Sequence, residues 1–332
     1  MTTPQQNYVV SVFAEPIQSE QLSTALMPFQ DTWTHLPISG PSALEFLHAG
    51  TSLLRAIELD PRSADRSIFS AAALRLIPVP SPNDRFLVVS PTACPLDLVH
   101  DEIGNWGERA IVSHLHSNTT PTTTMLSKVL RPHRSPLETY LLVCPMAMDR
   151  TLARHQQDII IVATGLESRC PVEISLQPPF ERAIACFGRK DVSWLHVDTH
   201  GNAHSIMLGP SRDCGKMGQA TDLPPDIPVP LVILVGCDLT YGATSIGSTV
   251  LERGATSVWG PCVTFASLAL AGSDTAQTFW YEKFFQSLLD GRDVGESLLT
   301  ARQTIQDASI LKFAWLLLGS SLLSFRRQQN GA

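Results

Sequence analysis

Two stretches decide the fold: residues 192–201 read VSWLHVDTHG, and residues 231–238 read LVILVGCD. Each is an apolar run of strand length that ends at a reactive side chain beside a glycine. That side chain is an imidazole at His200 and a thiol at Cys237. An imidazole can accept the proton that a thiol must lose to become a nucleophile. We therefore interpret the two stretches as the halves of one cysteine-nucleophile site.

Apolar runs alternate with helical patterns along the chain, and the runs lack the period-two polarity of a one-sided sheet. This indicates an α/β sandwich with a mainly parallel sheet covered on both faces. In such sheets the site lies at the carboxyl ends of the strands, so two neighbouring strands would bring His200 and Cys237 to one rim. The patterns predict further strands at 8–13, 72–78, 86–89, 140–144, 159–163 and, last of all, 257–259. They predict helices at 42–59, 96–106, 179–186 and 249–253, and two late ones opening near Ser273 and Asp293.

The composition of the chain argues against several classes of protein. The chain has 332 residues, 44% of them hydrophobic, enough to bury a substantial core. A net charge of −7 and scattered Lys and Arg argue against a general nucleic-acid or membrane-surface binder. The seven cysteines are odd in number, which argues against a disulfide framework, and include no C-x-x-C pair, which argues against a zinc ribbon; both favour a reducing cytoplasm. The polar start at 1–6 predicts no secretory signal, and the apolar stretch 313–325 is too short to span a bilayer.

Amide cleavage also needs hydrogen-bond donors for the developing oxyanion. The backbone amides of Gly201 and Cys237 are the candidates, and Gly236 permits the tight bend that lifts the thiol out of the strand. The alternative for Cys237 is a buried structural thiol, because cysteine is among the most buried residue types. Cys262, which follows a Trp-Gly-Pro turn, is the nearest rival nucleophile.

Other polar residues near the two strand ends leave alternatives open. His196, His200 and His204 are spaced by four, which on a helix would make them metal ligands, but the strand character before Gly201 argues against a metal. Asp198 is a candidate to orient an imidazole, line a substrate pocket or cap a turn. Asp238 is a candidate to stabilise the turn after Cys237 or to select a basic side chain in the substrate.

Residues 195–201, LHVDTHG, resemble the "LHLATHG" segment of the CHAT family, caspase-like cysteine proteases of the caspase–separase clan. Residues 232–240, VILVGCDLT, are similar to that family's "VVLSACET" segment. The resemblance continues in the strand at 254–259, the helix at 279–291, Ala-Arg-Gln at 301–303 and the apolar run at 314–319. Residues 86–102 look like a degenerate form of the region that holds "LPWELL". The match extends over about 190–320 and, more weakly, over about 42–190.

The resemblance implies a caspase-like three-layer αβα sandwich with a mainly parallel central sheet. It implies an N-terminal extension at 1–40, a protease domain at 41–326 and a polar tail at 327–332. It also implies His200 as acid–base, Cys237 as nucleophile, and the Gly201 and Cys237 amides as the oxyanion hole. The chain departs from the family at Asp238, where the family has Glu, and after Trp259, where the usual acidic residue is missing. The candidates for the substrate pocket are Asp198, Asp238 and Trp259.

The expected function is therefore a cytoplasmic cysteine endopeptidase that cleaves a protein substrate without a cofactor. By analogy with the family, we expect a bacterial regulated-proteolysis or defence pathway, with a gasdermin-like pore former or a CRISPR-associated effector as candidate substrates. Family members often carry sensor domains on the same chain. The sequence predicts none here, so we expect activation by a separate sensor protein or regulation by the chain's own loops. Asp198, Asp238 and Asp213 favour a basic or long uncharged residue on the N-terminal side of the cut bond. The alternatives are a catalytically silent scaffold that binds a partner, and a metal hydrolase.

Overall fold

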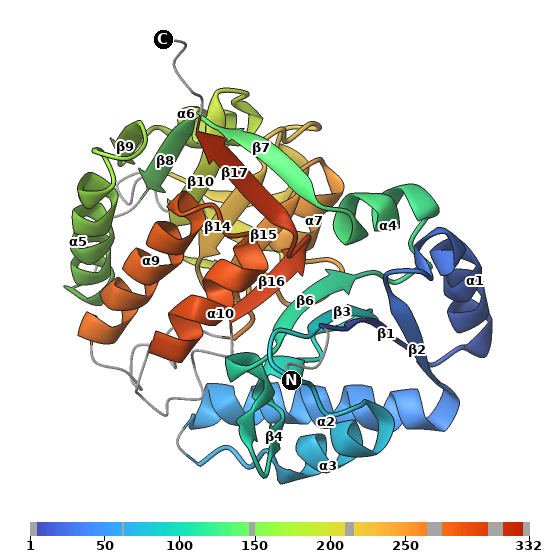
Figure 1. Ribbon diagram of the computed structural model, residues 1–332. Helices are drawn as coiled ribbons and strands as arrows, with labels where there is room; N and C mark the ends of the chain where they lie inside the picture. The colour runs from blue at the N-terminus through green and yellow to red at the C-terminus, as the bar shows by residue number, and fades with distance from the viewer. Residues whose placement is uncertain are drawn as a thin grey trace.

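A ten-stranded sheet forms the centre of the computed structural model, which describes residues 5–61, 63–145, 150–209, 216–263, 274–304 and 315–327 (Figure 1). Neighbouring strands are parallel throughout, except for one antiparallel pair, β15 with β16. The predicted α/β fold with a mainly parallel sheet is confirmed. The strands lie in the order β2 (Thr34–Ser39), β1 (Asn7–Phe13), β3 (Arg85–Ser90), β6 (Ile111–His116), β16 (Trp315–Gly319), β15 (Ser257–Pro261), β14 (Leu231–Val235), β10 (Val192–Asp198), β8 (Thr139–Cys144) and β9 (Val172–Leu176).

The central strands are buried on both faces, since every residue of β10, β14 and β15 is buried. This is why their sequences are continuous apolar runs rather than alternating ones. Figure 1 shows α5, α9 and α10 packed in front of the strands at one end of the sheet, and α2 and α3 below the other end. The helices are α1 (Pro16–Leu26), α2 (Gly40–Leu59), α3 (Ser67–Leu76), α4 (Thr123–Leu130), α5 (Arg150–Gly165), α6 (Phe180–Ala185), α7 (Ile246–Glu252), α9 (Asp274–Leu289) and α10 (Val294–Thr304).

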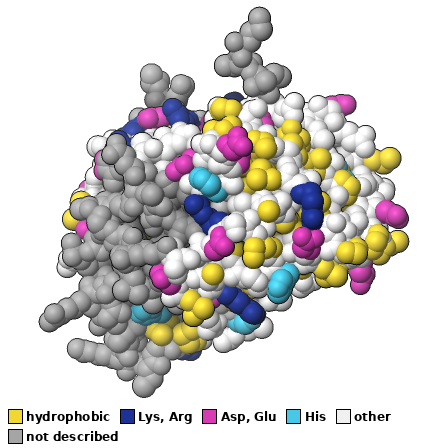
Figure 2. Space-filling view, turned by 90° about the horizontal axis from the view of Figure 1, so that it is seen from below, with side chains coloured by type: hydrophobic (Ala, Val, Ile, Leu, Met, Phe, Trp, Pro, Cys, Tyr) yellow, Lys and Arg dark blue, Asp and Glu magenta, His cyan; other side chains and the backbone are white. Residues whose placement is uncertain are grey.

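The underside of the molecule is a mixed surface. Figure 2 shows acidic, basic and hydrophobic side chains interspersed across the part of this face that it colours. Exposed hydrophobic side chains occur singly on α2, on α3 and at 103, of which Leu59 is the most exposed at 88%. Scattered apolar residues of this kind are ordinary for a folded protein. In the described part of the chain, no helix combines the length and apolar character needed to cross a bilayer.

Most of the predicted elements are confirmed, including the strands at 8–13, 86–89, 140–144, 192–198 and 231–235 and the helices at 42–59, 179–186 and 249–253. The segment at 1–40, whose role as a lid, an edge strand or a partner-binding arm the sequence leaves open, supplies two strands of the main sheet: β1 lies between β2 and β3, and β2 is an edge strand. Residues 257–259 are not the last strand, since β16 follows and pairs antiparallel with β15.

Three predicted elements are wrong. Residues 72–78 belong largely to α3, whose alanine-rich sequence favours a helix. Residues 159–163 lie inside α5, where Ile159 and Ala163 are buried one turn apart while Ile161 is 66% exposed. Residues 96–106 form a short 3₁₀ turn followed by the hairpin of β4 (His100–Asp101) and β5 (Gly104–Asn105), not a helix. The Asp101 carboxylate accepts hydrogen bonds from the Ile103 and Gly104 amides, which stabilises that turn.

A buried ion pair ties α10 to the turn at Asp97. The Arg302 guanidinium contacts the Asp97 carboxylate and donates to the Trp315 carbonyl oxygen at 2.8 Å. His114 Nε2 lies 3.4 Å from the other Asp97 oxygen. Burial alone would raise the pKa of Asp97, but the Arg302 charge and the His114 contact hold it below its usual value. The carboxylate therefore stays ionised inside the protein.

Replacing Arg302 with Leu should destabilise the fold by about 3–5 kcal/mol, because it leaves the Asp97 charge buried without its cation. The exposed Arg292→Leu is the control, with a cost of about 0.5 kcal/mol or less. Denaturant unfolding at several pH values measures both. Since the folded pKa of Asp97 is lowered, the stability it contributes is present above about pH 4 and is lost as the pH falls through the folded pKa. Equal stability of Arg302→Leu and wild type at neutral pH would contradict this account.

Candidate active site

Parallel pairing of β10 with β14 brings His200 and Cys237 to the same edge of the sheet. Asp198 is the last paired residue of β10 and lies opposite Val235, the last of β14. The Thr199 amide extends this pairing by donating to the Val235 carbonyl oxygen at 2.9 Å. His200 and Cys237 each stand two residues beyond the paired ends, and both side chains are partly exposed. The structure thus places them on adjacent turns at the carboxyl edge, as the sequence predicts.

The two turns pack backbone against backbone. A Cβ added to Gly236 would lie 3.1 Å from the Thr199 carbonyl oxygen and 3.4 Å from the Gly201 nitrogen. A Cβ added to Gly201 would lie 2.7 Å from a methyl carbon of Leu239 and 3.0 Å from the Ser205 carbonyl oxygen. No larger residue fits at either position without displacing a neighbour. The glycines therefore let the chain after the histidine approach the chain before the cysteine.

The turn that carries His200 is held by a small antiparallel sheet of β11 (Gly201–Asn202), β12 (Ser205–Met207) and β13 (Met217–Gln219). The Thr199 hydroxyl donates to the Met207 carbonyl oxygen, and the Met207 amide donates to the His200 carbonyl oxygen at 2.9 Å. The Ile246 amide donates to the Ala203 carbonyl oxygen at 2.8 Å. This last bond joins the histidine turn to the segment that follows the cysteine.

The turn that carries Cys237 depends on an unusual backbone conformation. Asp238 has φ 55°, in the left-handed region that Asp tolerates better than most residues. Its amide donates to the Val263 carbonyl oxygen at 3.3 Å, and the Thr240 amide donates to the Pro261 carbonyl oxygen at 3.3 Å. The chain leaves β14 at Gly236 and is then fixed to the residues around the end of β15.

The three candidates for the substrate pocket lie in different environments. Asp198 and Trp259 are fully buried, whereas Asp238 is partly exposed beside Cys237. Burial raises the pKa of Tyr281, and the Asp198 charge raises it further. Asp198 therefore lies near this buried tyrosine of α9. The Trp259 ring packs among aromatic side chains, at 4.6 Å from Phe284 between ring centroids. Of the three, Asp238 has surface open to a substrate, and the pocket roles of Asp198 and Trp259 stay predictions.

The three histidines spaced by four do not converge. His196 is buried and its Nδ1 lies 2.9 Å from the Tyr140 hydroxyl. His204 is exposed, with its Nδ1 3.3 Å from the Thr244 carbonyl oxygen. Among the residues that the structure describes, no three His, Cys, Asp or Glu side chains are grouped as metal ligands would be. His196, His200 and His204 therefore do not form the three-histidine metal site that their spacing suggested.

Two residues that the sequence does not mark also lie beside the turns. The Gln156 side chain, on α5, donates to the Asp198 carbonyl oxygen at 3.4 Å. His116, at the carboxyl end of β6, is buried with its ring close to the carbonyls of Thr240 and Gly242, although neither contact has the geometry of a hydrogen bond. Burial and the neighbouring His114 lower the pKa of His116 to about 3, so it is neutral at physiological pH. No local pattern marks His116, because its neighbours are set by the order of strands in the sheet.

The cysteines differ in accessibility. Among the six that the structure describes, Cys237 is partly exposed and the other five are buried. Burial raises the pKa of Cys94 to about 12. Burial, with the charges of Asp238 and Asp97, raises the pKa of the rival Cys262 well above its usual value. Cys214 and the acidic candidate Asp213 lie outside the described residues.

Brief treatment of the native protein with iodoacetamide should therefore modify Cys237 before the other five described cysteines, because alkylation needs an accessible thiolate. Peptide mass spectrometry measures the labelled fraction at each site, with urea-unfolded protein as the control in which all thiols react. Labelling of Cys262 or Cys94 at the rate of Cys237 would contradict this arrangement.

Comparisons with known proteins support the fold. No protein-family model matches the chain, and no curated protein sequence does. Among solved structures, the Arg-specific cysteine proteinase gingipain R matches at 10% identity over 97% of this chain and 79% of its own, with a TM-score of 0.58. The complex of the pro- and mature domains of the Porphyromonas gingivalis proteinase matches at 10% identity, over 96% and 79%, with a TM-score of 0.57. A Saccharomyces cerevisiae separase–securin structure matches at 12% identity and a TM-score of 0.47, and the chain spans 17% of its length.

At identities this low the likeness reports the arrangement of the sheet and helices. The chain shares that arrangement with gingipain R over most of both chains. This chain has a caspase-like α/β fold.

Proposed function

We propose that the chain is a cysteine endopeptidase in which Cys237 is the nucleophile and His200 the general acid–base. One observation carries the proposal: the β10–β14 register places His200 and Cys237 at equivalent positions beyond two adjacent strands. The likeness of the fold to a cysteine proteinase adds to it. The partial exposure of Cys237, set against five buried cysteines, further favours it over Cys262.

The proposed reaction assigns one role to each group. His200 takes the Cys237 thiol proton, and the thiolate attacks the carbonyl carbon of the peptide bond. The Gly201 and Cys237 amides stabilise the negative oxygen that forms. His200 then gives the proton to the leaving amine, the C–N bond breaks and a thioester remains. Water, deprotonated by His200, attacks the thioester, and the carboxylic acid leaves as Cys237 recovers its proton.

Asp238 is the proposed determinant of specificity. The carboxylates of Asp238, Asp97 and Glu58 all raise the pKa of Cys262, after the larger effect of burial, so all three lie near that thiol. Asp97 is paired with Arg302, whereas Asp238 directly follows the nucleophile and is partly exposed. We infer a preference for a basic or long uncharged residue on the N-terminal side of the cut bond. The Arg specificity stated for gingipain R is consistent with it.

The biological setting is proposed by analogy. Membership of the CHAT family rests on the segments at 195–201 and 232–240. It would place the protein in bacterial regulated proteolysis or defence, with a gasdermin-like or CRISPR-associated effector as the substrate and a separate sensor protein as the activator. A cytoplasmic location accords with the odd number of cysteines, which does not suggest a disulfide framework.

Cys237→Ala and His200→Ala should each lower cleavage of a proteome-derived peptide library by about 10³-fold or more, because each removes one member of the dyad. His204→Ala is the matched control, since it is an exposed histidine of the same loop and should retain activity. Mass spectrometry of new peptide termini measures cleavage. Cleavage by Cys237→Ala at the wild-type rate would refute the assignment. A wild-type protein that cuts nothing, with Cys237 unreactive to a peptidyl electrophile, would favour the silent scaffold.

Asp238→Asn should lower kcat/KM about 10–100-fold for peptides with Arg or Lys before the cut bond, because a charge-assisted hydrogen bond is lost. Matched peptides with Leu or Gln at that position should change little. Asp31→Asn, an exposed acidic residue on another part of the surface, is the control. An unchanged ratio between basic and uncharged peptides, or a wild-type preference for Asp, would remove Asp238 from this role.

A further inference from the structure

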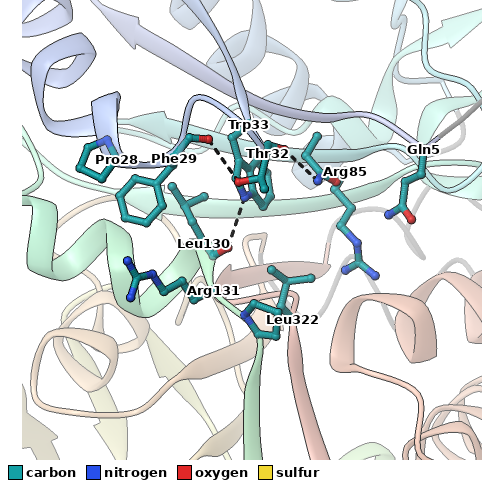
Figure 3. Close-up of a pocket in the computed structure, with 11 residues that line it drawn as sticks. Gln5, Pro28, Phe29, Thr32, Trp33, Arg85, Leu130, Arg131 and Leu322 are labelled. Carbon is teal, nitrogen blue, oxygen red and sulfur yellow. Dashed lines mark hydrogen bonds between the residues drawn. The ribbon is translucent and has the colours of Figure 1, made fainter.

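A cavity of about 510 Å³ opens at the amino ends of β1 and β3, on the edge of the sheet opposite His200 and Cys237 (Figure 3). β3 is six residues long, so the two edges are roughly 20 Å apart at ~3.3 Å per residue. The cavity lies where the segment before β2 meets the end of α4 and the turn that follows β16. Its walls include Phe29, Trp33, Arg85, Leu130, Arg131 and Leu322.

The wall of this cavity combines apolar residues, such as Phe29 and Trp33, with the polar Gln5, Asn7 and Thr32, and the Arg131 cation lies beside them. The Trp33 indole N–H donates to the Leu130 carbonyl oxygen at 3.2 Å, so its polar group is already satisfied. The exposed Arg131 guanidinium lies 5.6 Å from the centre of the Phe29 ring, within the range of a cation–π contact. Ligand pockets in proteins are roughly 300–1,000 Å³. The volume therefore suits an apolar or aromatic side chain inserted beside a positive charge.

A two-stranded parallel ribbon runs away from the cavity. β7 (His133–Leu137) pairs with β17 (Leu323–Arg327), and Figure 1 shows the two side by side at the front of the molecule. Pro132 and Leu322, the residues just before these strands, line the cavity. Ser324 lies opposite Arg134 and Arg326 opposite Pro136, so these four side chains share the outward face. Leu323, Phe325 and Leu137 point inward and are buried.

Exposed arginines lie together near this face, although the protein as a whole is acidic. Within the part of the chain that the structure describes, Arg131, Arg134 and Arg326 are exposed and make no ion pair. The net charge of the chain is −7, so a local group of such cations stands out from its background. Cations arranged along a groove attract a negatively charged partner and set its direction.

We propose that the cavity and the outward face of the β7–β17 ribbon form a docking groove for an extended acidic segment of a regulatory protein. One apolar or aromatic side chain of that segment enters the cavity, and its carboxylates lie against Arg131, Arg134 and Arg326. A nucleic acid fits less well, because three arginines on a chain of net charge −7 offer little to a continuous row of phosphates. The apolar residues of the cavity wall favour a peptide side chain.

Helix α10 connects this groove to the proposed active site. Arg85, in the cavity wall, contacts the Asp293 carboxylate at 2.8 Å, directly before α10. Near the other end of α10, Arg302 pairs with Asp97. Asp97 contacts His114, whose ring centroid lies 5.8 Å from that of His116, the residue beside the loop that follows Cys237. A partner bound in the groove therefore changes the rate of proteolysis through α10 without covering His200 and Cys237. This regulatory step rests on the proposed function, whereas the binding of a partner does not.

Fluorescence anisotropy of a short labelled peptide, one Phe flanked on both sides by Glu and Asp, tests the binding step on the full chain. We expect saturable binding that weakens about 10-fold or more in the Arg134→Glu Arg326→Glu double variant, or when Ala replaces the Phe. Arg182→Glu is the control, an exposed arginine elsewhere that should bind as wild type does. No saturable binding, or equal binding by the double variant, overturns the groove. Tighter binding of oligo-dT with the same arginine dependence reassigns it to nucleic acid and also overturns the proposal.

The same peptide, added at saturation during library cleavage, tests the regulatory step. We expect the cleavage rate of the wild type to change about 2-fold or more, and that of the double variant to stay constant. Binding without any change in rate overturns the regulatory role and leaves the dyad intact. If Cys237→Ala cleaves as well as wild type, the proposed function fails while the anisotropy result still decides the groove.

Discussion

The structure depends on the parallel pairing of β10 with β14 in the register that sets Asp198 opposite Val235. A slip of one residue would reverse the face of every side chain in one strand, and both strands are entirely buried. Close packing around side chains such as Trp194 and Ile233 therefore fixes the register, since forcing a side chain into a buried place shaped for a different one costs about 1–3 kcal/mol. The same register fixes the relative positions of His200 and Cys237, so the packing of the core also builds the site.

Beyond the strand ends, the backbone conformation sets the geometry of the two turns that hold His200 and Cys237. Gly236 and Gly201 let the two turns touch, and the left-handed Asp238 turns the chain sharply after Cys237. Behind them lie buried polar groups, His196 with Tyr140 on one side and Asp97 with Arg302 on the other. Such groups add little net stability to a core, but breaking a pair is costly. They hold the segments next to the turns in one arrangement, which suits a site whose parts come from separate strands.

Local pattern was sufficient to place the two turns and most elements, because a long apolar run that stops at a glycine marks the end of a buried strand. Local pattern was insufficient for short apolar runs, because such a run fits a buried strand and a buried helix equally well. The isoleucine-rich run at 159–163 resembles a strand, yet as part of α5 it buries Ile159 and Ala163 and exposes Ile161. The place of β16 between β6 and β15, and hence the approach of His116 to the loop after Cys237, depends on strand order. The cavity beside Trp33 also joins segments far apart in the chain, so no local pattern could indicate it.

The proposed cleft and the proposed docking groove lie at opposite edges of one sheet, so binding and cleavage need not compete. In the proposed site, Cys237 and His200 face one cleft and the Gly201 amide is an oxyanion donor. A crystal structure of the protein inactivated by a peptidyl acyloxymethyl ketone would show whether they do. We expect a covalent bond to Cys237 Sγ, the His200 ring facing the adduct, and the ketone oxygen within hydrogen-bond distance, about 3 Å, of the Gly201 amide. An adduct on another cysteine, or a His200 ring turned away from it, would rule this arrangement out.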